Sequence, residues 1–346
     1  MRRRTILMAT IVLLLGGGPA AAELSLPAGF TMQVYVTGQG FDATSARGAR
    51  GIPSVATLAF DPSGTLYLAR TGRRYAANAE EADDRWPIFR IPLGGARLTP
   101  GTERSFFYGP PLPNAQVGVV RGTQEAFVTT FDRERRVGVL YRIRDGRAEL
   151  FAGGTPERGS APLLKQPEGA VVDSAGNLYV ADREHGAVIR LGPTGAVLDA
   201  RLVSVPRPRV LAIDERDRLW IGSDGTAEQP WQRGPGEIWT LVPGGTPEVL
   251  LKGPVPGGMS VSPSGHLFVA DRQGAQIFAL SPEGKRVEFA RFTDGDAPRS
   301  LLFAPTTPDT QRAGIAGSLF VVTIKGGAFP VNEIIRITGP FDQLFK

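Results

Sequence analysis

The sequence predicts an all-β fold, a single six-bladed β-propeller, from two observations. The first is a short run of strand-forming residues that occurs six times along the chain. Its copies are LYLAR (66–70), AFVTT (126–130), LYVAD (178–182), LWIGS (219–223), LFVAD (267–271) and LFVVT (319–323). The second is that the aromatic residues in these runs lie 41 to 60 residues apart, which is the period of propeller blades and not of helical repeats. Because the repeats fill the chain, no second domain is expected.

The first 22 residues are predicted to be a secretory signal peptide, which leaves residues 23–346 as the propeller. Three arginines (Arg2–Arg4) precede an apolar run from Ile6 to Leu15 and a small-residue stretch that ends at Ala22. This is the layout of a secretory signal. No segment is long and apolar enough to predict a membrane span. The mature protein is therefore expected in the periplasm or outside the cell, by general or by twin-arginine export.

The charge and the cysteine content exclude several functions. Removal of the signal lowers the 39 basic residues to 36, against 34 acidic residues, so the mature chain offers no basis for nucleic-acid binding. The chain has no cysteine, which excludes disulfides, thiolate metal sites, c-type haem attachment and a lipidated cysteine. We therefore expect a monomer that binds either a small molecule or a protein or cell-wall partner.

The N-terminal segment is predicted to close the propeller ring. The strand Thr31–Val36 belongs to no complete repeat, whereas the last repeat ends with the strand Glu333–Thr338 and lacks an outer strand. Lending the N-terminal strand to the last blade joins the two ends of the ring and covers an exposed sheet edge. We therefore expect these two strands to pair antiparallel.

The strands of the blades follow from apolar or alternating runs that end at turn residues. They are expected at 57–60, 66–70 and 88–92 in blade 1; 117–120, 126–130, 139–144 and 149–152 in blade 2; 169–172, 177–182, 187–191 and 197–203 in blade 3; 210–213, 219–223, 237–242 and 248–251 in blade 4; within 256–292 in blade 5; and 300–303, 318–323 and 333–338 in blade 6.

The connections predict which face of the ring carries function. Tight turns such as DPSG (61–64) and DSAG (173–176) join the inner strand to the second strand, with residues typical of β-turns. The longer insertions, 71–86, 224–236 and 325–331, return to the opposite face. Because a rigid framework displays its functional loops, the ligand is expected at the face of the insertions. Trp86 and Trp231 lie in two of them, where they either stack on a ligand or hold their loops in place.

Alignment of the blades places one residue of each inner strand at the mouth of the central channel. These residues are Ala56, Gln116, Glu168, Arg209, Gly257 and Arg299. Arginines that converge on a concave site suit a carboxylate, a phosphate or a sugar acid. The alternative is that Glu168 and Arg209 form a structural ion pair. His185 lies in the loop of blade 3 and is a candidate base near neutral pH, whereas His266 follows a tight turn and is expected to be exposed.

The stretches Gln166–Pro193 and Pro256–Pro282 resemble the NHL repeat, and the chain resembles the SMP-30/gluconolactonase-like propellers. This resemblance implies hydrolysis of a lactone with a divalent metal such as calcium at the channel mouth. Of the mouth residues only Glu168 matches such a ligand, and Asp182 and Asp271, which end second strands at the same face, could complete the site. Their alternative role is to accept hydrogen bonds from neighbouring loops.

The start of the mature chain, LSLPAGFTMQVYV (24–36), resembles quinoprotein sugar dehydrogenases of the sorbosone dehydrogenase type. This second resemblance implies a quinone cofactor. That family places a catalytic histidine in an early inner strand, where this chain has Gln116 and Ala56. A non-catalytic binding module of the NHL type, which uses the same face, remains the third hypothesis, because the repeat specifies architecture and not activity.

Overall fold

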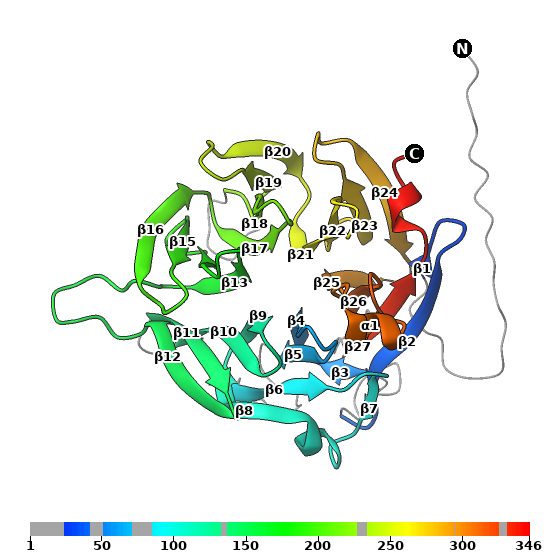
Figure 1. Cartoon of the computed structure of the whole chain (residues 1–346), viewed down its shortest axis with the longest axis horizontal. Helices are drawn as coiled ribbons and strands as arrows, with labels where there is room; N and C mark the ends of the chain where they lie inside the picture. Colours follow the sequence, from blue (N-terminus) through cyan, green and yellow to red (C-terminus); the bar gives the residue numbers. More distant parts are fainter. Residues whose placement is uncertain are drawn as a thin grey trace.

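The computed structural model describes residues 24–41, 51–70, 85–132, 137–226, 234–293, 295–324 and 331–346. They form a ring of six antiparallel sheets around a central channel, which confirms the predicted six-bladed propeller (Figure 1). The predicted signal peptide lies outside the described residues. No helix in the described part of the chain is long and apolar enough to cross a membrane.

The first three blades each contain four strands, ordered from the channel outwards. They are β4 (Val55–Phe60), β5 (Leu66–Arg70), β6 (Arg85–Ile91) and β8 (Phe107–Pro113) in blade 1; β9 (Gln116–Arg121), β10 (Glu125–Asp132), β11 (Val137–Arg144) and β12 (Arg147–Gly153) in blade 2; and β13 (Pro167–Val172), β14 (Leu178–Asp182), β15 (Ala187–Leu191) and β16 (Val197–Ser204) in blade 3.

The other three blades repeat this order, and blades 5 and 6 add N-terminal strands. They are β17 (Pro208–Ile213), β18 (Leu219–Ser223), β19 (Gly236–Leu241) and β20 (Glu248–Gly253) in blade 4; β21 (Pro256–Val261), β22 (Leu267–Asp271), β23 (Gln276–Leu280), β24 (Arg286–Phe292) and β1 (Leu24–Ser25) in blade 5; and β25 (Ala297–Phe303), β26 (Leu319–Ile324), β27 (Val331–Thr338) and β2 (Thr31–Gly38) in blade 6.

The predicted closure of the ring is confirmed. Strand β2 pairs antiparallel with β27, with Thr31 opposite Thr338 and Val36 opposite Ile334. Two further strands at this seam were not predicted: β1 pairs with β24 of blade 5, and β7 (Ala96–Leu98) runs parallel to the outer side of β2. The N-terminal segment therefore joins two blades and not one.

Blade 1 has an outer strand that the sequence did not predict. Strand β8 carries the residues FYGPPLP, and its prolines argue against an ordinary strand because proline donates no backbone hydrogen bond. The outermost position of a blade tolerates proline, since one side of that strand pairs with no neighbour. Strand β3 (Ile52–Pro53), which pairs with β27, was missed because it has only two residues.

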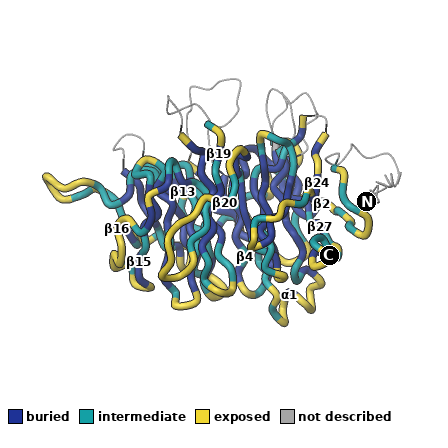
Figure 2. Tube along the Cα trace, turned by 90° about the horizontal axis from the view of Figure 1, so that it is seen from above, coloured by how far each residue is buried: buried dark blue, intermediate teal, exposed yellow. Residues whose placement is uncertain are grey.

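The core lies between the blades and is built on the repeated aromatic residues. Tyr67, Phe127, Trp220, Phe268 and Phe320 are fully buried. The sixth, Tyr179, is partly exposed, and its hydroxyl donates a hydrogen bond to Asp173 at 3.0 Å. Figure 2 shows the buried residues within the wall of the ring. Burying such large side chains in every blade interface fixes the inner strands around the channel.

The described part of the chain contains three short helices: η1 (Glu103–Phe106), α1 (Pro308–Arg312) and η2 (Phe341–Gln343). Helix α1 occupies the long first turn of blade 6, on the face of the tight turns (Figure 2). Its N-cap residue Thr307 also donates a hydrogen bond to the carbonyl of Pro62, in the first turn of blade 1, at 2.7 Å. This face therefore carries the tight turns, and the second strands end at the opposite face, where the longer insertions begin.

Candidate functional site

The inner strands enclose a cavity of about 730 Å³ in the central channel. All six residues predicted at the channel mouth line it: Ala56, Gln116, Glu168, Arg209, Gly257 and Arg299. Each is the first or second residue of an inner strand, or the third in blade 6. Alignment of the repeats therefore predicted which residues meet at one end of the channel.

Backbone irregularities in the inner strands accompany this arrangement. In each blade the register between the inner and the second strand shifts close to the mouth, for example between Val55 and Thr57, between Pro208 and Val210, and between Pro298 and Ser300. Such a β-bulge places one extra residue in the strand and changes the direction of its side chain. In these three blades the extra residues are Ala56, Arg209 and Arg299.

The inner strands approach one another closely at the mouth, which requires small residues in places. A Cβ atom at Gly258 would lie 2.6 Å from the Cα of Ser300 on the next strand. Thr57 Oγ1 accepts a hydrogen bond from the backbone N–H of Val117 at 2.9 Å, which ties blade 1 to blade 2. These contacts fix the backbone from which the mouth side chains project.

Glu168 is a nearly buried carboxylate held by two amide side chains. The side chain of Gln166 donates to its Oε1 at 3.0 Å, and the side chain of Gln116 donates to its Oε2. Thr129 of blade 2 donates to its backbone carbonyl at 2.5 Å. Glu168 is 9% exposed and is the one Asp or Glu among the described residues that line the cavity. The amide donors fix both oxygens of the carboxylate at the channel mouth.

Arg209 pairs with an aspartate of its own blade and not with Glu168. Its Nη1 lies 3.6 Å from Oδ1 of Asp224, beyond hydrogen-bond distance. The other oxygen of Asp224 lies 2.9 Å from the Nη2 of Arg183 in blade 3. The predicted alternative of a Glu168–Arg209 ion pair is therefore wrong. Asp224 is 2% exposed, so Arg183 and Arg209 share a buried carboxylate.

Asp182 serves the backbone and does not line the cavity. Its carboxylate accepts hydrogen bonds from the backbone N–H groups of Lys165, Gln166 and His185 at 2.6, 3.1 and 3.0 Å. The equivalent residues of three other blades bond the backbone at the same separation of 17 residues: Arg70 to Pro53, Thr130 to Pro113 and Ser223 to Pro206. The position thus has a structural role in four blades.

The carboxylates considered as metal ligands are not assembled into one site. Asp271 accepts hydrogen bonds from the Gly274 N–H at 3.1 Å and from the Gln276 side chain at 3.0 Å. It lies outside the cavity lining, as does Asp182. Across the described ranges, no three His, Asp or Glu side chains gather in a way that could hold a metal ion. This donor set does not fit the divalent metal that the lactonase resemblance implies.

The predicted base, His185, does not face the cavity either. Its Nδ1 lies 3.4 Å from Oδ2 of Asp182, and the histidine is absent from the cavity lining. Trp86 is buried, with the guanidinium of Arg70 3.5 Å above its ring, so it packs against its own blade. Trp231 lies outside the described residues, so its role as a ligand-binding residue stays a prediction.

His266 is partly buried, which corrects the expectation that it is exposed. Its ring stacks on Phe345 with a centroid distance of 4.2 Å. Burial lowers the pKa of His266, against an opposing effect from the charge of Glu283. This contact could not be predicted from the repeat pattern, because Phe345 belongs to the C-terminal tail and to no repeat.

Three polar residues of the site were not predicted. Gln166 and Asn114 line the cavity and precede the mouth residues Glu168 and Gln116 by two positions. Because side chains two positions apart in an extended chain share a side, this spacing could have indicated them. Asp224 begins an insertion with no counterpart in the repeat, and nothing in the sequence pattern points to its contact with Arg209.

Comparisons with known proteins agree with the fold. The NHL repeat family model matches residues 164–191, the inner three strands of blade 3 and their approach. A comparison with curated proteins finds no significant match.

Three solved structures illustrate the likeness. The PQQ-bound aldose sugar dehydrogenase of Streptomyces coelicolor is 14% identical, with a TM-score of 0.56, over 90% of this chain and 100% of that chain. A gluconolactonase of Xanthomonas campestris is 17% identical, with a TM-score of 0.53, over 84% and 87%. An inactive virginiamycin B lyase of Staphylococcus aureus, bound to quinupristin, is 15% identical, with a TM-score of 0.50, over 89% and 99%. At these identities the chains share the fold alone, and that fold supports an oxidoreductase, a hydrolase and a lyase.

Proposed function

We propose that this protein is a secreted or periplasmic propeller that binds a small anionic molecule at the channel mouth. The observation that carries the proposal is Arg209. Its side chain lines the cavity, is 24% exposed, and meets Asp224 beyond hydrogen-bond distance. Its N–H donors are therefore available to an incoming carboxylate or phosphate, which guanidinium groups bind with two parallel hydrogen bonds. Arg299 lines the same cavity from blade 6.

Two mouth positions carry small residues. They are Ala56 in blade 1 and Gly257 in blade 5, and Gly257 lets blades 5 and 6 approach closely, since a Cβ atom there would lie 2.6 Å from the backbone oxygen of Arg299. The amides of Gln116 and Gln166 are already bonded to Glu168. The charged side chains of the mouth are therefore Glu168, Arg209 and Arg299, and the positions at Ala56 and Gly257 add no polar side chain. Such an asymmetric site suits a ligand that presents its charge on one side.

Hydrolysis of a lactone is the reaction that this site supports best. A water molecule beside Glu168 would lose its proton to the carboxylate while its oxygen attacks the lactone carbonyl carbon. The ring C–O bond then breaks, the released alkoxide takes the proton, and the product is a hydroxy acid whose carboxylate the arginines can hold. The step uses Glu168 as a general base and passes through no metal, because the donor set does not fit one.

Binding of matched small molecules tests the proposal. Gluconate and hexanoate are six-carbon carboxylates, and glucose and hexanol are their neutral counterparts. Isothermal titration calorimetry should detect at least one of the anions, with Arg209→Ala and Arg299→Ala each weakening it about 10- to 100-fold, since a charged hydrogen bond contributes about 1.5–3 kcal/mol. Arg201→Ala is the control, because Arg201 is exposed on the outer strand β16. Failure of both anions to bind would overturn the proposal.

The catalytic part is tested separately with Glu168→Gln, which preserves the size of the side chain. If the protein hydrolyses lactones, this variant should lose turnover while its melting temperature changes little. A non-catalytic binding module would instead bind the anion with no lactone turnover in the wild-type protein. Turnover that survives Glu168→Gln would refute the assignment of the base.

A further inference from the structure

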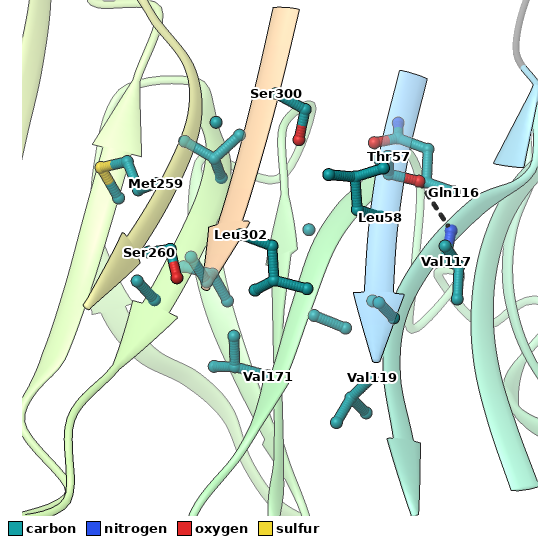
Figure 3. A pocket seen from close by; sticks show the side chains of 18 of the residues that line it. Thr57, Leu58, Gln116, Val117, Val119, Val171, Met259, Ser260, Ser300 and Leu302 are labelled. Carbon is teal, nitrogen blue, oxygen red and sulfur yellow. Dashed lines mark hydrogen bonds between the residues drawn. The ribbon is translucent and has the colours of Figure 1, made fainter. Parts of the chain in front are cut away.

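Most side chains in the wall of the channel below the mouth are apolar. Five side chains shown in Figure 3 line the cavity from five different inner strands: Leu58, Val119, Val171, Met259 and Leu302. Val210 and Ile213 add the same character from the sixth, β17. Val119, Val171 and Leu302 are only half-buried, so the channel exposes part of their apolar surface. A ligand that fills the channel would cover this surface.

Two of the three hydroxyl groups in the wall join neighbouring blades. Among the described residues that line the cavity, Thr57, Ser260 and Ser300 carry hydroxyls. Thr57 Oγ1 accepts from the Val117 N–H at 2.9 Å, and Ser260 Oγ accepts from the Phe303 N–H at 3.1 Å. A polyhydroxylated ligand needs a partner for each hydroxyl that it buries. The side chains of this wall offer few such partners below the mouth.

Charged and amide side chains are thus separated from most apolar side chains along the channel axis. The amides and charges lie at or just before the start of the inner strands, whereas the lining from Leu58 to Phe60 and from Val171 to Val172 continues to the other end. Phe60 lies four positions along the strand from the mouth residue Ala56, a depth of about 13 Å at the usual rise per residue. A cavity of about 730 Å³ is in the range that holds one small ligand.

We propose that the natural ligand is an aliphatic anion, with its carboxylate at Arg209 and an unbranched hydrocarbon chain in the channel. This inference rests on the proposed anion site and adds the class of the molecule that the site accepts. Each methylene group that enters the channel should tighten binding about fourfold, which corresponds to about 0.8 kcal/mol of apolar burial. The gain should end when the chain reaches the depth of the channel.

Calorimetry with the unbranched carboxylates from butyrate to decanoate tests the inference on the full mature protein. We expect the dissociation constant to fall stepwise with chain length and then level off, and hexanoate to bind more tightly than gluconate. Equal affinity for hexanoate and gluconate would leave the anion site standing and overturn the apolar channel. Hexanol that binds as tightly as hexanoate would overturn the anionic head group and with it the proposed function.

A pair of isosteric variants tests where the hydrocarbon chain of the ligand binds in the protein. Val171→Thr introduces a hydroxyl into the channel wall, whereas Val197→Thr makes the same change on the outer strand, where Val197 is 49% exposed. The first variant should weaken octanoate binding severalfold and leave butyrate binding unchanged, and the second should alter neither. If Val171→Thr changes neither octanoate binding nor the melting temperature, the hydrocarbon chain binds elsewhere and the inference is refuted.

Discussion

Replacing Val36 with alanine measures how much the N-terminal strand contributes to the ring. Val36 is fully buried and packs in one cluster with Ile52, Val322 and Ile334 of the seam. The substitution removes two methyl groups, worth about 0.8 kcal/mol each in transfer, and leaves a cavity that adds to the cost. We expect the free energy of unfolding to fall by about 2 kcal/mol.

Equilibrium unfolding in urea, followed by tryptophan fluorescence, gives this free energy. Gln33→Ala is the matched control, because Gln33 lies on the same strand, opposite Arg336, and is exposed; its effect should stay within about 0.5 kcal/mol. Deletion of residues 23–37 should go further, since it exposes the edge of β27 and favours aggregation. Equal effects of Val36→Ala and Gln33→Ala, with a monomeric deletion protein, would refute the closure of the ring by this strand.

Two further predictions concern buried polar groups. Asp182→Ala leaves three backbone N–H groups without their acceptor and should lower the free energy of unfolding by about 3 kcal/mol. The decrease should be the same with calcium or with a chelator, and the control Asp199→Ala on the exposed edge should not cause it. A decrease seen only with calcium would revive the metal site. Because burial lowers the pKa of His266, its stabilising contribution is complete above its ordinary pKa and is lost as the pH falls through the lowered value. Wild-type stability should therefore drop between pH 7 and pH 5 relative to His266→Phe, and parallel pH profiles would contradict this.

The architecture could be predicted from the sequence because the residues that define the repeat determine local structure. Turn residues, strand-forming runs and buried aromatics recur in every blade, and one unpaired strand at each end implied the closure. Strand β8 escaped because its prolines mask a strand whose edge position tolerates them. Such tolerance depends on the neighbouring sheet and cannot be seen in the strand's own residues.

The candidate site was predictable in its position and less so in its contacts. Register along the repeats gave the mouth residues, since equivalent positions in a symmetric ring must meet. The partners of Arg209 and His185 were not predictable, because Asp224 and Asp182 act through loop geometry that no repeat encodes. Separation of polar and apolar groups along the channel also required the structure, since it depends on which residues of each bulged strand face inwards.

The dependence of anion binding on ionic strength tests the central claim most directly. Binding of hexanoate through the guanidinium groups at the mouth should weaken as sodium chloride rises, because salt screens the attraction between partly exposed charges. The same titration on Arg209→Ala should show weaker binding and a smaller salt dependence. Binding that is indifferent to salt, or that Arg209→Ala leaves unchanged, would contradict an anion site at the channel mouth.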